Sequence, residues 1–532
     1  MQKRIAIAFF ALMVVFGLLT VKLALVQVQN TEASEIVGTK TETVNVSRGG
    51  IYDRNRVPLV NTEKRYITYA LPGTEVLKKI TPYVNGDDLS NIYSQMSKGK
   101  VIKFNSSHIF NDSEIKSVGI VKRYSGERLC PQLIGYLDSD GNGVSGLEKA
   151  YDSYLKMTGG EIAVTWNADA KGHVLLGKEL KVTQIGYPDK GGIVLTIDKE
   201  FQSALEKIMK NSDISVGAAV VMDSENSEIL ASVSLPDFDP DNVADYLDDE
   251  NAPFINRADT PFSVGSVFKP FVAAAALENG VTVEHYCNGI TFKGGVGFRC
   301  NNGAIHGNVT MSTAMEKSCN TYFIELGQKV GAEKLVNLCA GLGLGKSFEY
   351  EDGVYSKAGI LPSAEAVSTE SSLSNLSFGQ GDLLATPWQM AAAYSAIANG
   401  GVYHTPVLMK EILGENGETI QKLATESGVR VISKQTANSL DKILQGVVKN
   451  GTAKLGFTER TVGRGKTATA QSGSVKDGRE ILHTWFCGYF TYKDKTYTVV
   501  IFKEDGTSGA NDCAPVFKTI TEKVCDIADG RK

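Results

Sequence analysis

The sequence predicts an α+β protein of several parts: a single N-terminal transmembrane helix, a strand-rich domain, and a larger domain in which helices pack against an antiparallel sheet. Three observations support this prediction. A long uncharged run begins the chain, short alternating runs broken by turn residues follow it, and helical and strand patterns mix from about residue 190 onward. The 532 residues, 42% of them hydrophobic, are enough for two or three domains with their own cores.

The N-terminal run has the features of a membrane anchor. Lys3 and Arg4 precede an uncharged stretch over residues 5–21, and further apolar residues extend it. The positive charge before the run places residues 1–4 in the cytoplasm and the rest of the chain outside. No convincing small-residue cleavage site follows, so we favour an uncleaved single-pass anchor at residues 5–26 over a removed signal peptide.

Residues 35–185 predict an elongated, strand-rich spacer domain, with alternating runs such as RYITYAL and turn clusters such as VNGDD. Within it, DSDGNGVSGLE resembles a calcium-binding loop, because Asp138, Asp140 and Asn142 occupy the first, third and fifth positions. Lys149 occupies the twelfth position, where a bidentate glutamate is needed. We therefore expect a turn that leads into a helix.

The remaining residues, 190–532, predict a sheet with helices packed against it. KEFQSALEKIMKN is amphipathic, residues 216–235 predict two strands joined by a turn, and TPWQMAAAYSAIANGG predicts a helix that ends at Gly400. Near the end of the chain, HTWFCGYF and KTYTVVIFKE predict paired antiparallel strands.

Two classes of partner are disfavoured. A net charge of −5, a pI near 5.9 and the lack of a Lys/Arg-rich run argue against nucleic acid. GRGKTATAQSG, residues 463–473, resembles the end of a phosphate-binding loop, but that motif needs a glycine where this chain has Arg460. We expect neither nucleic-acid nor nucleotide binding.

TPFSVGSVFKPFVAAAALENG predicts a nucleophile on a helix. It begins with turn residues and becomes apolar, which places Ser266 near the helix N-terminus and Lys269 one turn further on the same face. A serine hydroxyl becomes a useful nucleophile when a nearby base accepts its proton, and a lysine serves as that base if burial or a second cation lowers its pKa. Alone, a Ser-x-x-Lys tetrapeptide is a weak signal.

The order of three motifs strengthens the prediction that Ser266 is a nucleophile. Ser318-Cys319-Asn320 and then Lys466-Thr467-Ala468-Thr469 follow the first motif, in the order of serine β-lactamases and penicillin-binding proteins. The chain resembles the class B penicillin-binding proteins, which are membrane-anchored peptidoglycan D,D-transpeptidases. The resemblance covers nearly the full length and includes SRGGIYDRNRVPLV, AVVMDSENSEILASVSLPDFDPD, NRA at Asn256 to Ala258, and VVKNGTAKL.

The resemblance implies a pedestal or dimerisation-like domain at residues 35–185 and a penicillin-binding, serine β-lactamase-like transpeptidase domain at residues 190–532. It also implies that Ser266 attacks the penultimate D-Ala carbonyl of a stem pentapeptide and that Lys269 takes the serine proton. Ser318 would relay a proton to the departing D-Ala.

The same resemblance gives the remaining motif residues binding roles. Asn320 would hold the substrate amide, Lys466 would supply a second cation that helps keep Lys269 neutral, and Thr467 and Thr469 would bind the terminal carboxylate. The family pattern has glycine where this chain has Ala468. Because glycine lets a ligand lie close along a strand, the added methyl raises the question of whether the substrate still fits.

For partners, the resemblance implies stem peptides on lipid-linked glycan strands, β-lactams, and a glycosyltransferase of the SEDS type, with the catalytic domain outside a single-pass anchor. It implies no cofactor. Two alternatives stay open: a β-lactam sensor or β-lactamase-like protein, and a catalytically weak cell-wall scaffold, which Ala468 allows.

Eight cysteines leave several interpretations open. Cys287 and Cys300 bracket a glycine-rich segment, so they form a disulfide, stay as free thiols, or bind a metal with His306. We expect no metal, because a zinc site needs four ligands at tight spacing and these are scattered. Cys319 is expected to be structural and not a nucleophile, because no histidine is predicted beside it.

Overall fold

The computed structural model describes residues 2–33, 38–124, 126–175, 179–186, 190–351, 353–423 and 427–531. The chain divides into two compact units. The smaller unit comprises Met1–Arg48, Asn61–Arg123 and Gly159–Asp189, and the larger unit comprises Gly49–Val60, Tyr124–Thr158 and Lys190–Lys532.

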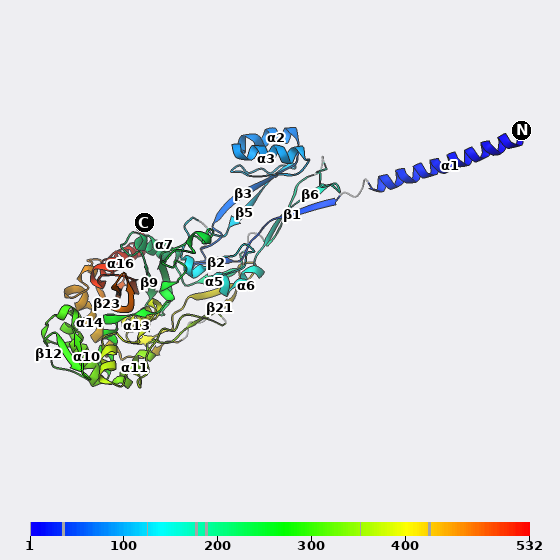
Figure 1. The fold of residues 1–532 in the computed structure, drawn as a ribbon. Helices are drawn as coiled ribbons and strands as arrows, with labels where there is room; N and C mark the ends of the chain where they lie inside the picture. The colour runs from blue at the N-terminus through cyan, green and yellow to red at the C-terminus, as the bar shows by residue number, and fades with distance from the viewer. Residues whose placement is uncertain are drawn as a thin grey trace. The chain divides into compact units, whose positions relative to one another are not determined.

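The smaller unit begins with helix α1 (Gln2–Ala33) and contains two three-stranded antiparallel sheets (Figure 1). Among the residues whose side chains are described, no helix is long and apolar enough to cross a membrane. One sheet has the order β1-β6-β7 and the other β4-β3-β5. Their bounds are β1 Gly38–Val46, β3 Glu63–Ala70, β4 Ile102–Asn105, β5 Ile115–Lys122, β6 Glu161–Ala168 and β7 Lys181–Ile185.

The alternation of side chains along β3 gives this unit two small cores. Tyr69 packs with Val118, Ile162 and neighbouring apolar residues of the two sheets. Ala70 faces the other way and packs beneath α2 (Thr74–Ile80) and α3 (Gly86–Ser97), which lie beside the sheet. Successive strand residues point to opposite faces, so one strand serves both cores.

The boundaries of the strand-rich domain differ from the sequence-based expectation of one continuous segment, 35–185. Gly49–Val60 and Tyr124–Thr158 belong to the larger unit. Strand β2 (Gly50–Tyr52) pairs in parallel with β8 (Gly192–Leu195), and Ile51 is fully buried in the larger core. A parallel pair between segments so far apart in the sequence leaves no local pattern from which it can be read.

The near-calcium loop in this part of the chain is a turn, as expected. The Asp138 carboxylate accepts hydrogen bonds from the backbone N–H groups of Asp140 (2.9 Å) and Asn142 (2.8 Å), and the short helix α5 (Gly146–Ala150) follows. The Asp138 side chain therefore hydrogen-bonds the backbone that follows it, in an Asx turn.

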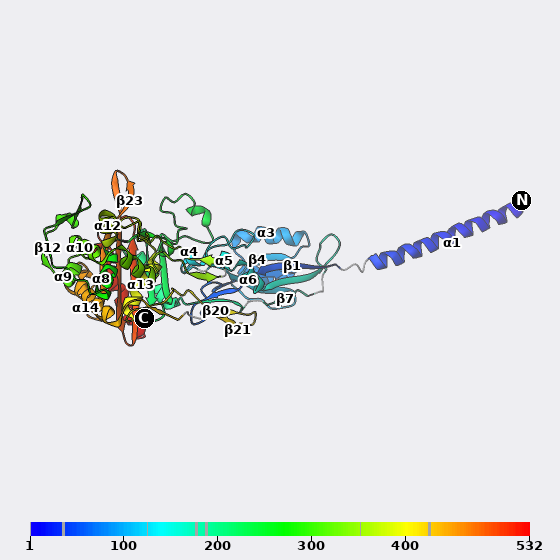
Figure 2. The same ribbon diagram turned by 90° about the horizontal axis from the view of Figure 1, so that it is seen from below.

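A five-stranded antiparallel sheet, with the order β10-β9-β25-β24-β23, forms the centre of the larger unit (Figure 2). The strands are β9 Gly217–Asp223, β10 Ile229–Leu235, β23 Gly463–Lys476, β24 Arg479–Tyr492 and β25 Lys495–Lys503. The predicted turn between β9 and β10 and the predicted pairing of β24 with β25 are confirmed.

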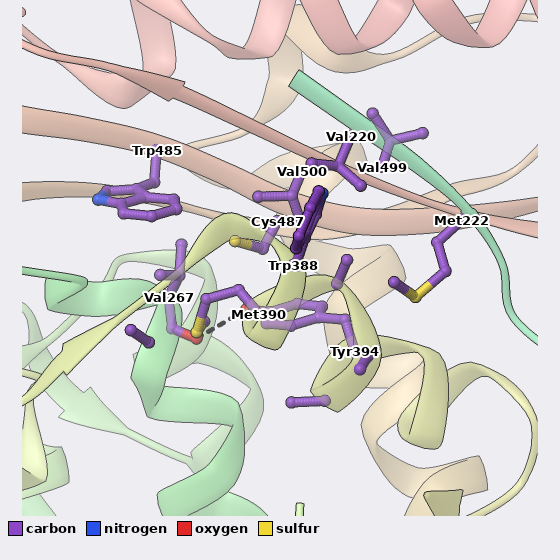
Figure 3. Close-up of a cluster of buried hydrophobic side chains, with 14 of the residues drawn as sticks. Val220, Met222, Val267, Trp388, Met390, Tyr394, Trp485, Cys487, Val499 and Val500 are labelled. Carbon is purple, nitrogen blue, oxygen red and sulfur yellow. Dashed lines mark hydrogen bonds between the residues drawn. The ribbon is translucent and has the colours of Figure 1, made fainter. Parts of the chain in front are cut away.

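Helices cover both faces of this sheet. Val221 lies among apolar residues of α7 (Lys199–Lys210) and α16 (Ala514–Ala528). Val220 points the opposite way and packs with Trp388 and Tyr394 of α13 (Pro387–Ala398), as Figure 3 shows. Strands covered on both faces are apolar throughout, which explains why β9 and β25 lack a polar side in the sequence.

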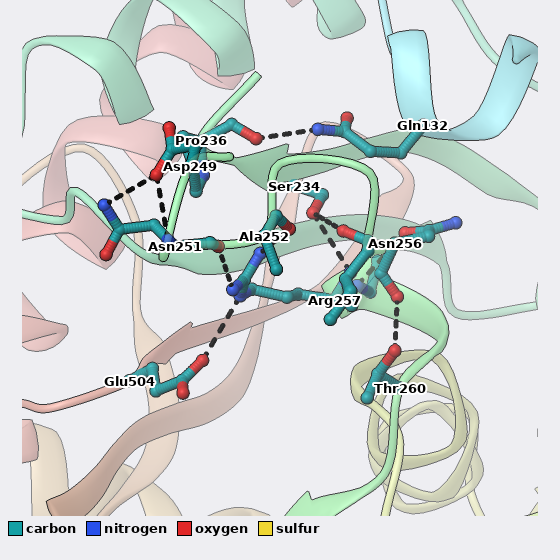
Figure 4. A network of polar contacts seen from close by, with 12 residues as sticks. Gln132, Ser234, Pro236, Asp249, Asn251, Ala252, Asn256, Arg257, Thr260 and Glu504 are labelled. Carbon is teal, nitrogen blue, oxygen red and sulfur yellow. Dashed lines mark hydrogen bonds and ion pairs between the residues drawn. The ribbon is translucent and has the colours of Figure 1, made fainter. Parts of the chain in front are cut away.

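Arg257, in the NRA segment, ties the loop after β10 to the sheet (Figure 4). Its side chain is 4% exposed and pairs with Glu504, just after β25, at 3.2 Å. It also donates to the carbonyls of Asn251 (2.6 Å) and Ala252 (3.2 Å), while its backbone N–H donates to Ser234. A buried guanidinium with this many acceptors organises the segment that leads to Ser266.

We expect Arg257→Ala to destabilise the larger unit by about 2–4 kcal/mol, because a buried charged donor that three acceptors share is lost. Two of the three tryptophans, Trp388 and Trp485, are buried in this unit, so fluorescence-monitored urea unfolding measures the change. Arg479→Ala is the matched control, because the Arg479 side chain is 59% exposed and its ion pair with Asp505 is expected to contribute less than about 1 kcal/mol. Equal effects of the two substitutions would contradict this account.

Candidate active site

Ser266 lies in a 3₁₀ turn (η4, Gly265–Phe268) that continues directly into helix α8 (Lys269–Glu278). This is the predicted position, near the start of an apolar helix. Gly265 has φ 59°, and a Cβ added there would lie 2.9 Å from the Cβ of Ala470. Only glycine fits this close contact, which holds the serine turn against strand β23.

Ser318 lies between helices α9 (Met311–Glu316) and α10 (Asn320–Val330). Its φ of 54° places a non-glycine residue in the left-handed region. Such a conformation costs about 1–3 kcal/mol and persists only where the surroundings impose it. Here the backbone N–H of Ser318 donates to the carbonyl of Met315, and the backbone N–H of Cys319 donates to the carbonyl of Ala314. The strained turn directs the Ser318 hydroxyl toward Ser266.

Lys466 comes from β23, the edge strand of the central sheet. Its side chain is fully buried, and its ammonium donates to Ser318 Oγ at 3.1 Å and to the Thr467 carbonyl at 2.8 Å. The next two hydroxyls along the strand have other partners: Thr467 donates to Thr452 (3.0 Å), and Thr469 accepts from the Gly509 N–H (3.3 Å).

The Ser318 hydroxyl is the centre of the site. It donates to Ser266 Oγ at 3.1 Å and lies 3.1 Å from the ammonium nitrogens of both Lys269 and Lys466. Lys269 Nζ also lies 2.7 Å from the Ser318 carbonyl and 2.7 Å from Asn320 Oδ1, so each of the three protons has a partner when Lys269 is charged. The three sequence motifs therefore meet at one point, with Ser318 connecting the nucleophile to both lysines.

Burial sets the charge of the two lysines. It lowers the pKa of Lys269 to about 7, although the nearby Cys319 and Cys300 act in the opposite direction. Burial also lowers the pKa of Lys466 well below its usual range, and the charge of Lys269 lowers it further. The sequence predicted that Lys466 helps keep Lys269 neutral; in the structure desolvation is the main cause of the lowered pKa of both lysines, and repulsion between the two disfavours charging both at once.

The rate of serine acylation should therefore depend on pH. If Lys269 acts as a base it must be neutral, so the rate is expected to be low in acid, to rise about tenfold per pH unit, and to level off above a pKa of about 7. Stopped-flow acylation by a fluorescent penicillin measures this profile, with tryptophan fluorescence as the control for folding at each pH. A rate that stays flat from acid through pH 7 would rule out this role for Lys269.

Ala468 is 3% exposed, and its Cβ lies 3.5 Å from the position of a Cβ added to Gly265. Its methyl group thus contributes to the packing between β23 and the serine turn. The methyl group of Ala468 therefore does not project freely from the strand. This answers part of the question of whether the substrate still fits beside it.

Sequence reasoning missed several neighbours of the site. Asn320 donates to the Arg299 carbonyl (2.9 Å), and Thr452, in the family-like VVKNGTAKL stretch, accepts from Thr467. The expectation that the metal-ligating residues are scattered is wrong: potential ligand atoms of Cys287, Cys300, His306 and Cys319 all lie within 4.8 Å of one another. These cysteines are free thiols, without a disulfide.

A serine at a helix start, joined through a second serine to two buried lysines, has the composition that nucleophilic acyl transfer requires. Residues 217–522 match the family model described as penicillin binding protein transpeptidase domain, and the chain belongs to this family. The resemblance to class B penicillin-binding proteins is thereby confirmed.

Curated proteins of similar sequence agree with this family assignment. The chain is 29% identical to stage V sporulation protein D of Bacillus subtilis over 87% of its own length and 74% of the relative. It is 31% identical to penicillin-binding protein PbpB of Mycolicibacterium smegmatis, over 75% of this chain and 64% of that protein. It is also 28% identical to peptidoglycan D,D-transpeptidase PbpA of the same organism, over 68% and 74%.

Solved structures show the same fold. Penicillin binding protein 3 from Mycobacterium tuberculosis, complexed with aztreonam, is 24% identical, with a TM-score of 0.66, over 92% of this chain and 97% of the other. A chain from a peptidoglycan synthase complex is 24% identical, with a TM-score of 0.67, over 98% of both chains.

Proposed function

We propose that the protein is a peptidoglycan D,D-transpeptidase that cross-links stem peptides through a serine acyl-enzyme and is acylated by β-lactams. The observation that carries this proposal is the Ser318 hydroxyl within 3.1 Å of Ser266 Oγ, Lys269 Nζ and Lys466 Nζ. No other cluster is needed to supply a nucleophile, a base and a proton relay.

In the first half of the reaction, Ser266 Oγ attacks the carbonyl carbon of the penultimate D-Ala, and its proton passes to neutral Lys269, directly or through Ser318. The carbonyl oxygen becomes an oxyanion, which the N–H groups of Ser266 and Thr469 would stabilise. The C–N bond then breaks, and the terminal D-Ala leaves with a proton delivered by Ser318, which takes back the proton held by Lys269. An acceptor amine attacks the ester in the second half, the C–O bond to Ser266 breaks, and the proton that the amine loses restores the Ser266 hydroxyl.

Binding roles follow from charge and position. Lys466 and the hydroxyls of Thr467 and Thr469 would hold the terminal carboxylate, whose negative charge would let Lys466 keep its proton. Asn320 would hold the substrate amide. The substrate backbone would lie along the outer edge of β23, beside Ala468, because an edge strand offers its peptide groups to an extended ligand.

The test uses the full-length chain in mild detergent with a stem pentapeptide ending in D-Ala-D-Ala and an amine acceptor. We expect release of D-Ala together with a cross-linked product, and a penicillin adduct that persists for many turnovers of the donor. Rapid release of hydrolysed penicillin would indicate a β-lactamase. Neither product nor adduct from the folded chain would indicate a catalytically weak scaffold, and Ser266→Ala is the inactive control.

We also propose the membrane arrangement that the sequence predicts: a cytoplasmic tail at residues 1–4, a single-pass anchor at 5–26, and a catalytic domain at 190–532 outside the membrane. The uncharged run over residues 5–21 and the continuous helix α1 support this proposal. Recovery of the expressed chain in the membrane fraction, and its release when residues 1–34 are deleted, is the expected result.

Residues 35–185 would serve as a pedestal that, with the anchor, contacts a glycosyltransferase of the SEDS type. The structural neighbour from a peptidoglycan synthase complex supports looking for such a partner. Co-purification of a membrane glycosyltransferase with the tagged full-length chain tests it, with the chain lacking residues 1–34 as the control for the contribution of the anchor.

A further inference from the structure

Thr452 lies beside the third motif but belongs to none of the three. It follows helix α14 (Lys434–Asn450) and is half-buried. Its hydroxyl lies 3.0 Å from the hydroxyl of Thr467 and accepts the proton that Thr467 donates. Within the part of the chain that the structure describes, the Thr452 hydroxyl has no other hydrogen-bond partner. A hydroxyl group is both a donor and an acceptor, so the proton of Thr452 remains to be donated.

The backbone holds Thr452 in this position. The N–H of Thr452 donates to the carbonyl of Glu316, at the end of α9 and two residues before Ser318, at 3.0 Å. The N–H of Gly451 donates to the Val447 carbonyl at 3.0 Å, and a Cβ added to Gly451 would lie 2.6 Å from the Glu316 carbonyl oxygen. Thr452 is therefore tied by its backbone to the segment that leads to Ser318, and by its side chain to β23.

The protons around the third motif show why this contact matters. Thr467 has one hydroxyl proton, and it points to Thr452. The ammonium of Lys466 donates to Ser318 Oγ and to the Thr467 carbonyl. To donate to a substrate carboxylate, the Thr467 O–H group has to turn away from Thr452. The Thr467 oxygen is then free to accept the proton of Thr452.

We propose that Thr452 is a positioning residue for the substrate carboxylate, acting through Thr467. When the carboxylate binds, the hydrogen bond between the two hydroxyls reverses, so that Thr452 donates to Thr467 and Thr467 donates to the carboxylate. Both O–H groups rotate, and each proton stays on its own oxygen.

The reversed chain of hydrogen bonds has two effects. It holds the Thr467 hydroxyl in the orientation that faces the carboxylate, and the bond from Thr452 polarises the Thr467 O–H group and strengthens its own donation. This inference rests on the proposed function and adds to it a residue that need not touch the substrate. Valine at position 452 keeps nearly the same shape but offers no proton, whereas serine keeps the hydroxyl.

The first test compares acylation of the full-length chain by penicillin and by penicillin methyl ester. Penicillin carries a carboxylate beside its reactive ring, and the ester does not. We expect Thr452→Val to lower the second-order rate constant with penicillin about five- to tenfold, the usual contribution of one hydrogen bond, and to change that with the ester less than about twofold. Thr452→Ser should retain the rate of the unaltered chain. Equal losses with both compounds, or no loss with penicillin, would overturn the proposal.

A double-variant cycle tests whether Thr452 acts through Thr467. In a chain that carries Thr467→Val, the further change Thr452→Val is expected to cause no additional loss in the rate with penicillin. Losses that multiply would show that Thr452 acts independently of Thr467. Thr461→Val is the matched control and should leave the rate unchanged, because the Thr461 hydroxyl donates to the Thr491 carbonyl at 2.6 Å. If Thr452→Val does not fold, as judged by tryptophan fluorescence, Thr452→Ala replaces it with the same expectations.

Binding without chemistry separates this proposal from the proposed function. The Ser266→Ala chain forms no acyl-enzyme, so ligand-observed NMR titration with penicillin measures reversible binding alone. Adding Thr452→Val to this chain is expected to weaken the binding of penicillin about five- to tenfold and to leave that of the methyl ester unchanged. A chain that binds penicillin but does not cross-link peptides would still test Thr452 in this way. Unchanged binding of penicillin would overturn the role of Thr452, whatever reaction the protein catalyses.

Discussion

Lys269→Met is expected to reduce the rate of penicillin acylation by a factor of about 10²–10⁴, the usual contribution of a positioned base. Methionine fills nearly the same volume but accepts no proton, and it leaves Ser318 Oγ and Asn320 Oδ1 without the donor that now joins them. Stopped-flow kinetics with a fluorescent penicillin measures the loss.

The stability of the folded state is not expected to fall in the Lys269→Met variant. Lys269 is fully buried, and replacing a buried ammonium by an apolar side chain removes its desolvation cost. We therefore expect an unfolding midpoint that is unchanged or higher, together with the loss of activity. Lys207→Met, at an exposed position on α7, is the control and should change neither quantity. Full acylation by the Lys269→Met variant would show that another group takes the serine proton.

Ser318→Ala is expected to lose about 10²–10⁴ in the same rate, because it removes the hydroxyl that connects Ser266 with both lysines. If Ser318 and Lys269 act as one unit, the double variant with Lys269→Met should be little worse than either single variant. Single and double variants measured in one assay decide the point. Losses that multiply would indicate that the two residues act independently.

Much of the site could be predicted from the sequence because each motif carries its own local geometry. Ser266 and Lys269 are spaced by one helical turn, and Lys466 begins the third motif, Lys466-Thr467-Ala468-Thr469. The order of the motifs then identified the family, which implied that they meet in space. Their meeting at Ser318 Oγ could not be derived from spacing alone, because it depends on a left-handed residue at φ 54°.

Other features needed the structure because they depend on long-range contacts. Cys287, Cys300 and His306 are close in the sequence, but their fourth neighbour, Cys319, was assigned to a different motif, so the cluster went unrecognised. Likewise, Gly49–Val60 belongs with the larger unit, where β2 pairs with β8 and Ile51 joins the core. The pKa of Lys269 also depends on complete burial, which no local pattern reveals.

The central claim is that Ser266 is the nucleophile. It is tested most directly by incubating the full-length chain with penicillin, digesting it and locating the adduct by tandem mass spectrometry. We predict a single stable adduct on Ser266, and none in the Ser266→Ala variant with its fold intact. An adduct on Ser318, on Cys319 or elsewhere, or an adduct that persists in Ser266→Ala, would contradict the account.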